Sequence, residues 1–238
     1  MIHIKEEQME KVKYEEMLPH EFEAALHQFP VAYVPVGSLE WHGRHLALGN
    51  DTLKSYGILL RTAQKYGGVV VPPTYWGHMA HWKPGCHPGL PPETVDGLYV
   101  AIFKGLVAVG FKVVIGVTGH DVTEQVDSLQ QAVDAITAPG KAAGFAMKEG
   151  SLYDLPGDKM DHAAHWETSI LMHLRPDLVD MDKIKDEILT TQDGAKEAGI
   201  HGRDPRIYAS PELGEKIVNR ISDNIGKKAQ ELLAGLEK

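Results

Sequence analysis

The sequence from residue 31 to residue 51 reads VAYVPVGSLEWHGRHLALGND, an apolar run that leads into a polar loop. The run Val31–Val36 has only apolar residues, which is typical of a strand buried on both faces of a parallel sheet. Gly37 and Ser38 end this run, and the loop that follows carries glutamate, histidine and aspartate. We therefore predict a buried strand whose end opens directly into a reactive loop.

Apolar runs alternate with helical patterns along the rest of the chain, which favours a mostly parallel sheet with helices on both faces. We expect a single α/β domain over residues 1–238, with residues 1–18 as an N-terminal arm. The predicted strands are 31–36, 69–72, 112–117 and 144–147. The predicted helices are 21–28, 51 or 52 to 66 with Asp51 or Thr52 as the cap, 92–110, 122–136, 162–174 and 213–236.

Composition excludes several classes of protein. The net charge of −9 and the lack of a basic stripe argue against a nucleic-acid partner. No apolar run reaches the roughly 20 residues that span a bilayer, and no signal peptide is visible, so we expect no membrane partner. The single cysteine, Cys86, fits a reducing, cytoplasmic location.

Histidine is abundant, with 13 residues, and eight of them fall in four short segments. Three of these segments directly follow predicted strands. Because ligands in open α/β sheets bind beyond the carboxyl ends of the strands, we expect the three loops to meet at one site.

The first segment places Glu40 and His42 two residues apart, so both side chains point to one side of an extended loop. Asp51 follows at the start of the next helix. Carboxylate and imidazole together suit Zn²⁺ or Mn²⁺. The alternative is a solvated loop in which Asp51 only caps the helix.

The second segment, residues 75–89, combines three histidines and two tryptophans in a loop rich in glycine and proline. Tryptophan offers a flat apolar face with one donor, so this loop is a candidate substrate wall, or else a surface loop folded over its own aromatics. The candidate residues are Trp76, His78, His81, Trp82 and His87.

The third and fourth segments add further candidates. His120 follows the third strand and is well placed for a metal, although Asp121 to Glu124 also fits a simple capping motif. His162, His165 and Trp166 fall at helical spacing and should share a face, as in an ordinary amphipathic helix. Glu167 lies about 180° from His162 on a helix, so both serve one site only if the helix begins after His162.

These motifs, in this order, resemble the creatininase family of metal-dependent hydrolases. The similarity extends from about Val34 to Gly214, and no nucleotide-binding or serine-hydrolase motif competes with it. The matching residues are Gly37, Ser38, Glu40, His42, Gly43, His45, Leu46, Asp51, Gly77, His81, Gly110, Phe111, Lys112, Gly119, His120, His162, Ala163, Glu167, Thr168, Ser169, Ala209, Ser210, Glu212 and Gly214.

The resemblance implies a homohexamer and a site for two divalent ions, Zn or Mn. Its ligands would be Glu40, His42, Asp51 and His120, with Asp51 as the bridge. Creatininase itself takes a last ligand two residues after the histidine, where this chain has Val122. Other members use the Glu-Thr-Ser glutamate, so we expect Glu167, with Glu124 as the alternative.

The resemblance also implies that a metal-bridged hydroxide attacks a ring carbonyl. We expect His162, Asp161 and His81 to act in catalysis, with His162 as the general acid or base. Trp76, His78, Trp82, His87, Arg44 and Trp166 are the candidate substrate-binding residues.

Several relatives open keto-inositol rings by C–C hydrolysis, as part of inositol catabolism. The polar loop residues favour such a small cyclic polar substrate, with a creatininase-type cyclic amide as the alternative. An isomerase using the same metals, a non-catalytic binding protein and a metal-storage protein are further readings.

Overall fold

The computed structural model describes residues 11–78, 86, 88–149, 161–185 and 197–237 of the chain. It forms a four-stranded, fully parallel sheet with the strand order β2-β1-β3-β4. The strands are β1 (Val31–Val36), β2 (Val69–Val70), β3 (Val113–Thr118) and β4 (Ala143–Lys148). This architecture confirms the α/β fold class predicted from the sequence.

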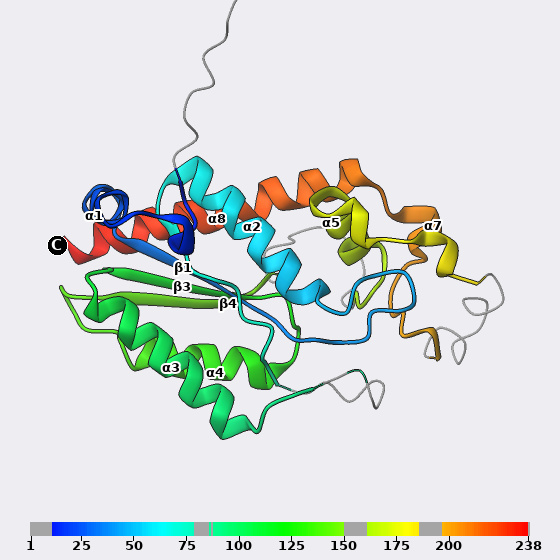
Figure 1. The fold of residues 1–238 in the computed structure, drawn as a ribbon, viewed down its shortest axis with the longest axis horizontal. Helices are drawn as coiled ribbons and strands as arrows, with labels where there is room; N and C mark the ends of the chain where they lie inside the picture. Colours follow the sequence, from blue (N-terminus) through cyan, green and yellow to red (C-terminus); the bar gives the residue numbers. More distant parts are fainter. Residues whose placement is uncertain (1–10, 79–85, 87, 150–160, 186–196, 238) are drawn as a thin grey trace, which may run out of the picture.

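Helices cover both faces of the sheet (Figure 1). On one side lie α2 (Asn50–Tyr66), α5 (His165–Leu174) and α8 (Pro211–Leu236), and on the other lie α3 (Pro92–Ala108) and α4 (Thr123–Asp134). The remaining elements are η1 (Tyr14–Glu16), α1 (Pro19–Gln28), η3 (Pro176–Leu178), η4 (Met181–Lys183) and α7 (Pro205–Tyr208).

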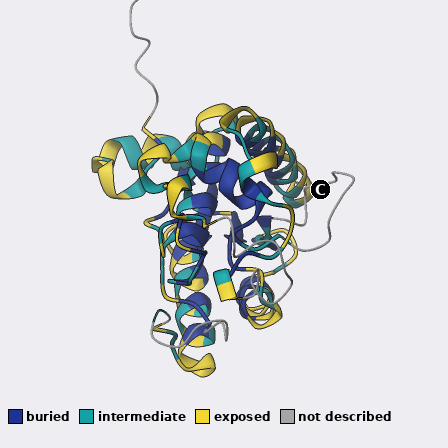
Figure 2. Cartoon of the chain, turned by 90° about the vertical axis from the view of Figure 1, so that its right-hand side faces the viewer, coloured by how far each residue is buried: buried dark blue, intermediate teal, exposed yellow. Residues whose placement is uncertain are grey.

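The continuous apolar run of β1 has a physical reason, because its side chains alternate between two cores. Val31 and Tyr33 pack into the core under α2 and α8, whereas Ala32, Val34 and Val36 pack into the core above α3 and α4. Figure 2 shows the buried residues gathered on the sheet and on the inward faces of the helices. None of the described helices combines the length and the apolar character that crossing a membrane requires.

Two of the helix starts that differ from the sequence predictions affect the site. Helix α2 begins at Asn50 and has Gly49 at its cap, so Asp51 lies inside the first turn and is not the cap. Helix α5 begins at His165, three residues later than predicted. His162 therefore does not share a helix face with His165 and Trp166, and that prediction is wrong.

The late start of α5 is fixed by Asp161 and by the backbone at Ala163. The Asp161 carboxylate accepts the backbone N–H groups of Trp166 and Glu167, each at 3.0 Å, and so satisfies donors that a helix start leaves open. Ala163 adopts a φ of 52°, which turns the chain sharply just before the helix. His162 therefore lies before the helix. This is the condition under which His162 and Glu167 can belong to one site.

Candidate metal centre

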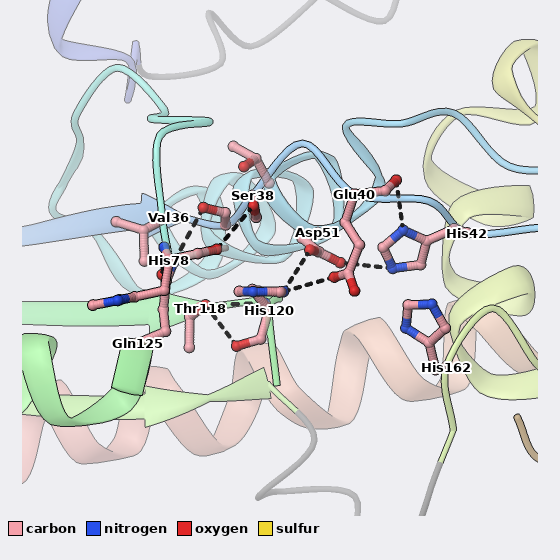
Figure 3. A network of polar contacts seen from close by, with 12 residues as sticks. Val36, Ser38, Glu40, His42, Asp51, His78, Thr118, His120, Gln125 and His162 are labelled. Atoms are coloured by element: carbon pink, nitrogen blue, oxygen red, sulfur yellow. Dashed lines mark hydrogen bonds and ion pairs between the residues drawn. The ribbon is translucent and has the colours of Figure 1, made fainter. Parts of the chain in front are cut away.

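Acidic and histidine side chains converge beyond the carboxyl ends of β1 and β3 (Figure 3). Glu40 and His42 come from the loop after β1, and Asp51 comes from the first turn of α2. His120 follows β3, and Glu167 reaches in from α5. The parallel topology thus brings these distant segments to one edge of the sheet.

A first donor group is formed by Glu40, Asp51 and His120. The Nδ1 atom of His120 lies 2.7 Å from Glu40 Oε2 and 3.1 Å from Asp51 Oδ2. One ligand atom from each residue lies within 4.8 Å of the other two, and all three residues are buried.

A second donor group is formed by His42, Asp51 and Glu167. The Nε2 atom of His42 lies 2.9 Å from Asp51 Oδ1 and 3.5 Å from Glu167 Oε2. Asp51 therefore belongs to both groups, and each of its two oxygens faces a different histidine.

These donors fit a divalent cation. His42 Nε2, both Asp51 oxygens, Glu40 Oε1 and His120 Nε2 are buried and lack a hydrogen bond of acceptable geometry. Asp51 Oδ1 lies 2.9 Å from His42 Nε2, and Asp51 Oδ2 lies 3.1 Å from His120 Nδ1. Ligand atoms placed about 2.0–2.2 Å from a common Zn²⁺ are spaced in this way. A mixed set of imidazole and carboxylate ligands also matches what zinc and manganese accept.

The electrostatics of the cluster favour bound positive charge. Burial disfavours the charged imidazoles, but neighbouring carboxylates outweigh it and raise the pKa of His42 to about 9 and that of His120 to about 10. Burial acts against the Asp51 carboxylate too, yet the two histidines hold its pKa well below its ordinary value. Burial raises the pKa of Glu40. Without an ion, protons on the histidines balance this buried negative charge.

His162 sits next to this cluster, with its ring centroid 4.4 Å from that of His42. Its Nε2 lies 2.9 Å from the backbone oxygen of Trp41, which fixes the proton on Nε2 and leaves the lone pair on Nδ1. Burial, together with the charge of His42, lowers the pKa of His162 to about 4. The imidazole is therefore neutral at pH 7 and able to accept a proton.

The other predicted site residues are placed differently. Besides capping α5, the Asp161 carboxylate lies 3.0 Å from His165 Nδ1, which makes it a support for the helix that carries Glu167. Glu124 is exposed in the first turn of α4, whereas Glu167 lies within the cluster.

Three of the predicted loop residues, His81, Trp82 and His87, lie outside the described residues. His78 is buried, and its Nε2 lies 2.7 Å from the Ser128 hydroxyl on α4, so it ties the loop to that helix. Trp76 is 46% exposed, and Arg44 is exposed with its guanidinium 6.0 Å from the Trp41 ring. Trp166 is half-buried and its ring packs 4.3 Å from that of His165.

Sequence reasoning missed three residues around the cluster. Lys54 is completely buried and forms ion pairs with Glu149 and Glu167. Burial raises the pKa of Glu149 to about 8 despite the nearby lysine. His201 pairs its backbone with that of His162, with both N–H to O distances at 2.8 Å. The spacing of Lys54 three residues after Asp51 places both on one helix face, but the sequence carries no signal that Lys54 is buried.

Comparison with known proteins identifies the family of the chain. The family model for creatininase, described as creatinine amidohydrolase, matches residues 15–228. The chain belongs to the creatininase family. Members of this family are metal-dependent hydrolases, which confirms the class of enzyme predicted from the sequence.

Two curated relatives of the chain have names that describe different substrates. A creatinine amidohydrolase of Pseudomonas putida is 27% identical over 180 residues, which is 66% of this chain and 68% of the relative. A mycofactocin precursor peptide peptidase of Mycolicibacterium smegmatis is 32% identical over 167 residues, which is 65% of this chain and 62% of the relative.

Solved structures confirm the creatininase fold. A manganese creatininase superposes with a TM-score of 0.77 at 23% identity, covering 93% of this chain and 98% of the other. A Zn-Zn creatininase variant gives a TM-score of 0.78 at 22% identity with the same coverage.

Proposed function

We propose that the chain hydrolyses a C–N amide bond at a centre of two divalent ions, zinc or manganese. One ion would be held by Glu40, Asp51 and His120, and the other by His42, Asp51 and Glu167. The main observation behind the two-ion centre is that the two carboxylate oxygens of Asp51 face two different histidines, His42 and His120. The Zn-Zn and manganese forms of creatininase support the choice of metals.

When bound, such ions make a coordinated water acidic and polarise the carbonyl oxygen of a substrate. The chain supplies the proton transfers. His162 is neutral at pH 7, so its Nδ1 accepts a proton from the attacking water and returns it to the leaving nitrogen. The Trp41 carbonyl, which accepts from Nε2, holds the ring in the required tautomer throughout.

The choice of an amide follows from the relatives, since creatinine amidohydrolase and a peptide peptidase both cleave C–N bonds. The sequence favoured a keto-inositol because of the polar residues of its second segment and Arg44. Of these, His78 is engaged with Ser128, and Arg44 is exposed over Trp41. The amide therefore becomes the first candidate, and the keto-inositol stays a prediction that the same assay tests.

The experiment measures substrate loss and proton release at pH 7 with enzyme loaded with Mn²⁺ or Zn²⁺. Opening a cyclic amide to a carboxylate and a protonated amine releases almost no acid, whereas C–C hydrolysis of a ketone ring releases about one proton per turnover. We expect creatinine or another small cyclic amide to be consumed without acid release. Consumption of a keto-inositol with acid release, and of no amide, would overturn the proposal in favour of C–C hydrolysis.

The matched control is Asp51→Asn, which keeps the side-chain shape but removes the shared carboxylate. It should fold and show no turnover. Turnover that persists in this variant would show that the reaction does not use the metal centre.

A further inference from the structure

Lys54 is a charged residue in an unusual place. Among the described residues it is the only lysine or arginine that is buried, with an exposed fraction of 0%. It lies one turn after Asp51 on α2, and its ammonium group forms ion pairs with Glu149, just after β4, and with Glu167 on α5. Burying an ammonium group costs free energy unless carboxylates compensate its charge. Glu149 and Glu167 supply these carboxylates.

Glu167 is shared between this lysine and the metal centre. Its Oε1 faces Lys54, and its Oε2 lies 3.5 Å from His42 Nε2. The same Oε2 accepts the backbone N–H of Ala163 at 2.6 Å. The Ala163 backbone thus holds the carboxylate toward His42 independently of Lys54.

The first donor group has no comparable competitor in the described contacts. There the carboxylates of Glu40 and Asp51 both face His120, at 2.7 and 3.1 Å. Each donor group consists of two carboxylates and one histidine. The two groups differ because only the second has a positive charge, the Lys54 ammonium, paired with one of its carboxylates.

We propose that Lys54 sets the affinity of the second ion site, the one formed by His42, Asp51 and Glu167. The ammonium charge neutralises part of the Glu167 carboxylate and repels a divalent ion, so this ion is held less tightly and exchanges faster than the ion at Glu40, Asp51 and His120. The inference rests on the proposed two-ion function. It assigns Lys54 as a positioning and charge-setting residue, because its full burial keeps it away from substrate.

The main test is a calorimetric titration of metal-free protein with Mn²⁺ at pH 7. Wild-type protein should show two classes of site. In the double variant Lys54→Met with Glu149→Gln, methionine fills the volume and position 149 carries no charge, whereas Glu167 keeps its full negative charge facing His42. Because Ala163 still holds Glu167, the weak class should tighten about tenfold or more, while the tight class stays unchanged.

The control is Lys65→Met on the same helix, because Lys65 pairs with Asp223 at an exposed position. It should leave both classes as in wild type. An unchanged or weakened second class in the double variant, once circular dichroism shows that it folds, would overturn the role of Lys54. A wild-type protein that binds no Mn²⁺ would instead overturn the proposed function itself.

A second measurement uses the wild-type holoenzyme alone. Crystals soaked briefly in a chelator should lose the anomalous signal of Mn²⁺ first between His42 and Glu167. Loss that begins at Glu40 and His120, or proceeds equally at both positions, would contradict the proposal even if the double variant does not fold.

Discussion

Gly119 packs directly against the backbone of Asp51, and a Cβ atom built on Gly119 would lie 2.1 Å from the Asp51 carbonyl oxygen. This close approach joins the end of β3 to the first turn of α2. It allows His120, the next residue, to reach within 3.1 Å of the Asp51 carboxylate. The contact between the backbones of Gly119 and Asp51 therefore sets the distance between His120 and the Asp51 carboxylate.

Replacing Gly119 with alanine should separate these two segments. Since no real Cβ atom tolerates a distance of 2.1 Å to backbone, β3 or α2 must shift. We expect a loss of stability of a few kcal/mol, typical of overpacking at about 1–3 kcal/mol, and a loss of bound metal. Thermal unfolding and metal analysis check this. Gly105→Ala is the control, because its added Cβ meets nothing within 4 Å, and it should be neutral or stabilising.

Metal binding should release protons and strengthen with pH. In the metal-free protein the pKa values of His42 and His120 are raised to about 9 and 10, so both imidazoles are protonated at pH 7. Each must lose its proton to become a ligand, so binding of two ions releases about two protons. The affinity should rise from pH 6 to pH 9 and level off above pH 10. Calorimetry in buffers of different ionisation enthalpy measures this, and binding without proton release would contradict it.

His162→Gln should impair turnover without removing metal. The loss of a general acid or base lowers kcat by about 10²- to 10⁴-fold. Burial and the charge of His42 lower the pKa of His162 in the metal-free protein, so its imidazole is neutral at pH 7 and can accept a proton. Measuring kcat and metal content on the same sample distinguishes a role in proton transfer from a role as metal ligand. Lost metal with the activity would make His162 a ligand, as its nearness to Glu40 and His42 also permits.

Removing metal should destabilise the fold. An ion at a hundred times its Kd adds about 2.7 kcal/mol to the stability of a protein that binds it only when folded. For a domain of this size that corresponds to a rise in Tm of about 5–10 °C. Scanning calorimetry with and without a chelator measures the shift. Identical Tm values would mean that the cluster holds no ion in the folded protein.

Much of the site was predictable because its ligands lie close to strand ends. Glu40 and His42 follow β1, and His120 follows β3, so the parallel topology alone brings them together. Asp51 was predictable as a ligand, but not its place inside the first turn of α2.

The start of α5 could not be predicted because helical spacing continues through His162 in the sequence. The helix stops short of it because the Asp161 carboxylate takes the first backbone donors and Ala163 turns the chain. Such hydrogen bonds from a side chain to the nearby backbone end a helix locally, and the spacing of apolar residues does not show them.

Lys54 was not predicted because a lysine on an amphipathic helix is normally solvated. Its burial depends on Glu149 and Glu167, which arrive from segments about a hundred residues away. Only the assembled fold shows that these carboxylates compensate it.

The most direct test of the two-ion centre is the metal content of four purified proteins: wild type, Asp51→Asn, Glu167→Gln and Glu124→Gln. Because Asp51 would hold both ions and Glu167 only one, we expect two ions in wild type, none in Asp51→Asn and one in Glu167→Gln. Glu124→Gln should keep two ions. Two ions in Glu167→Gln together with one in Glu124→Gln would contradict the assignment, and two ions in Asp51→Asn would contradict the shared ligand itself.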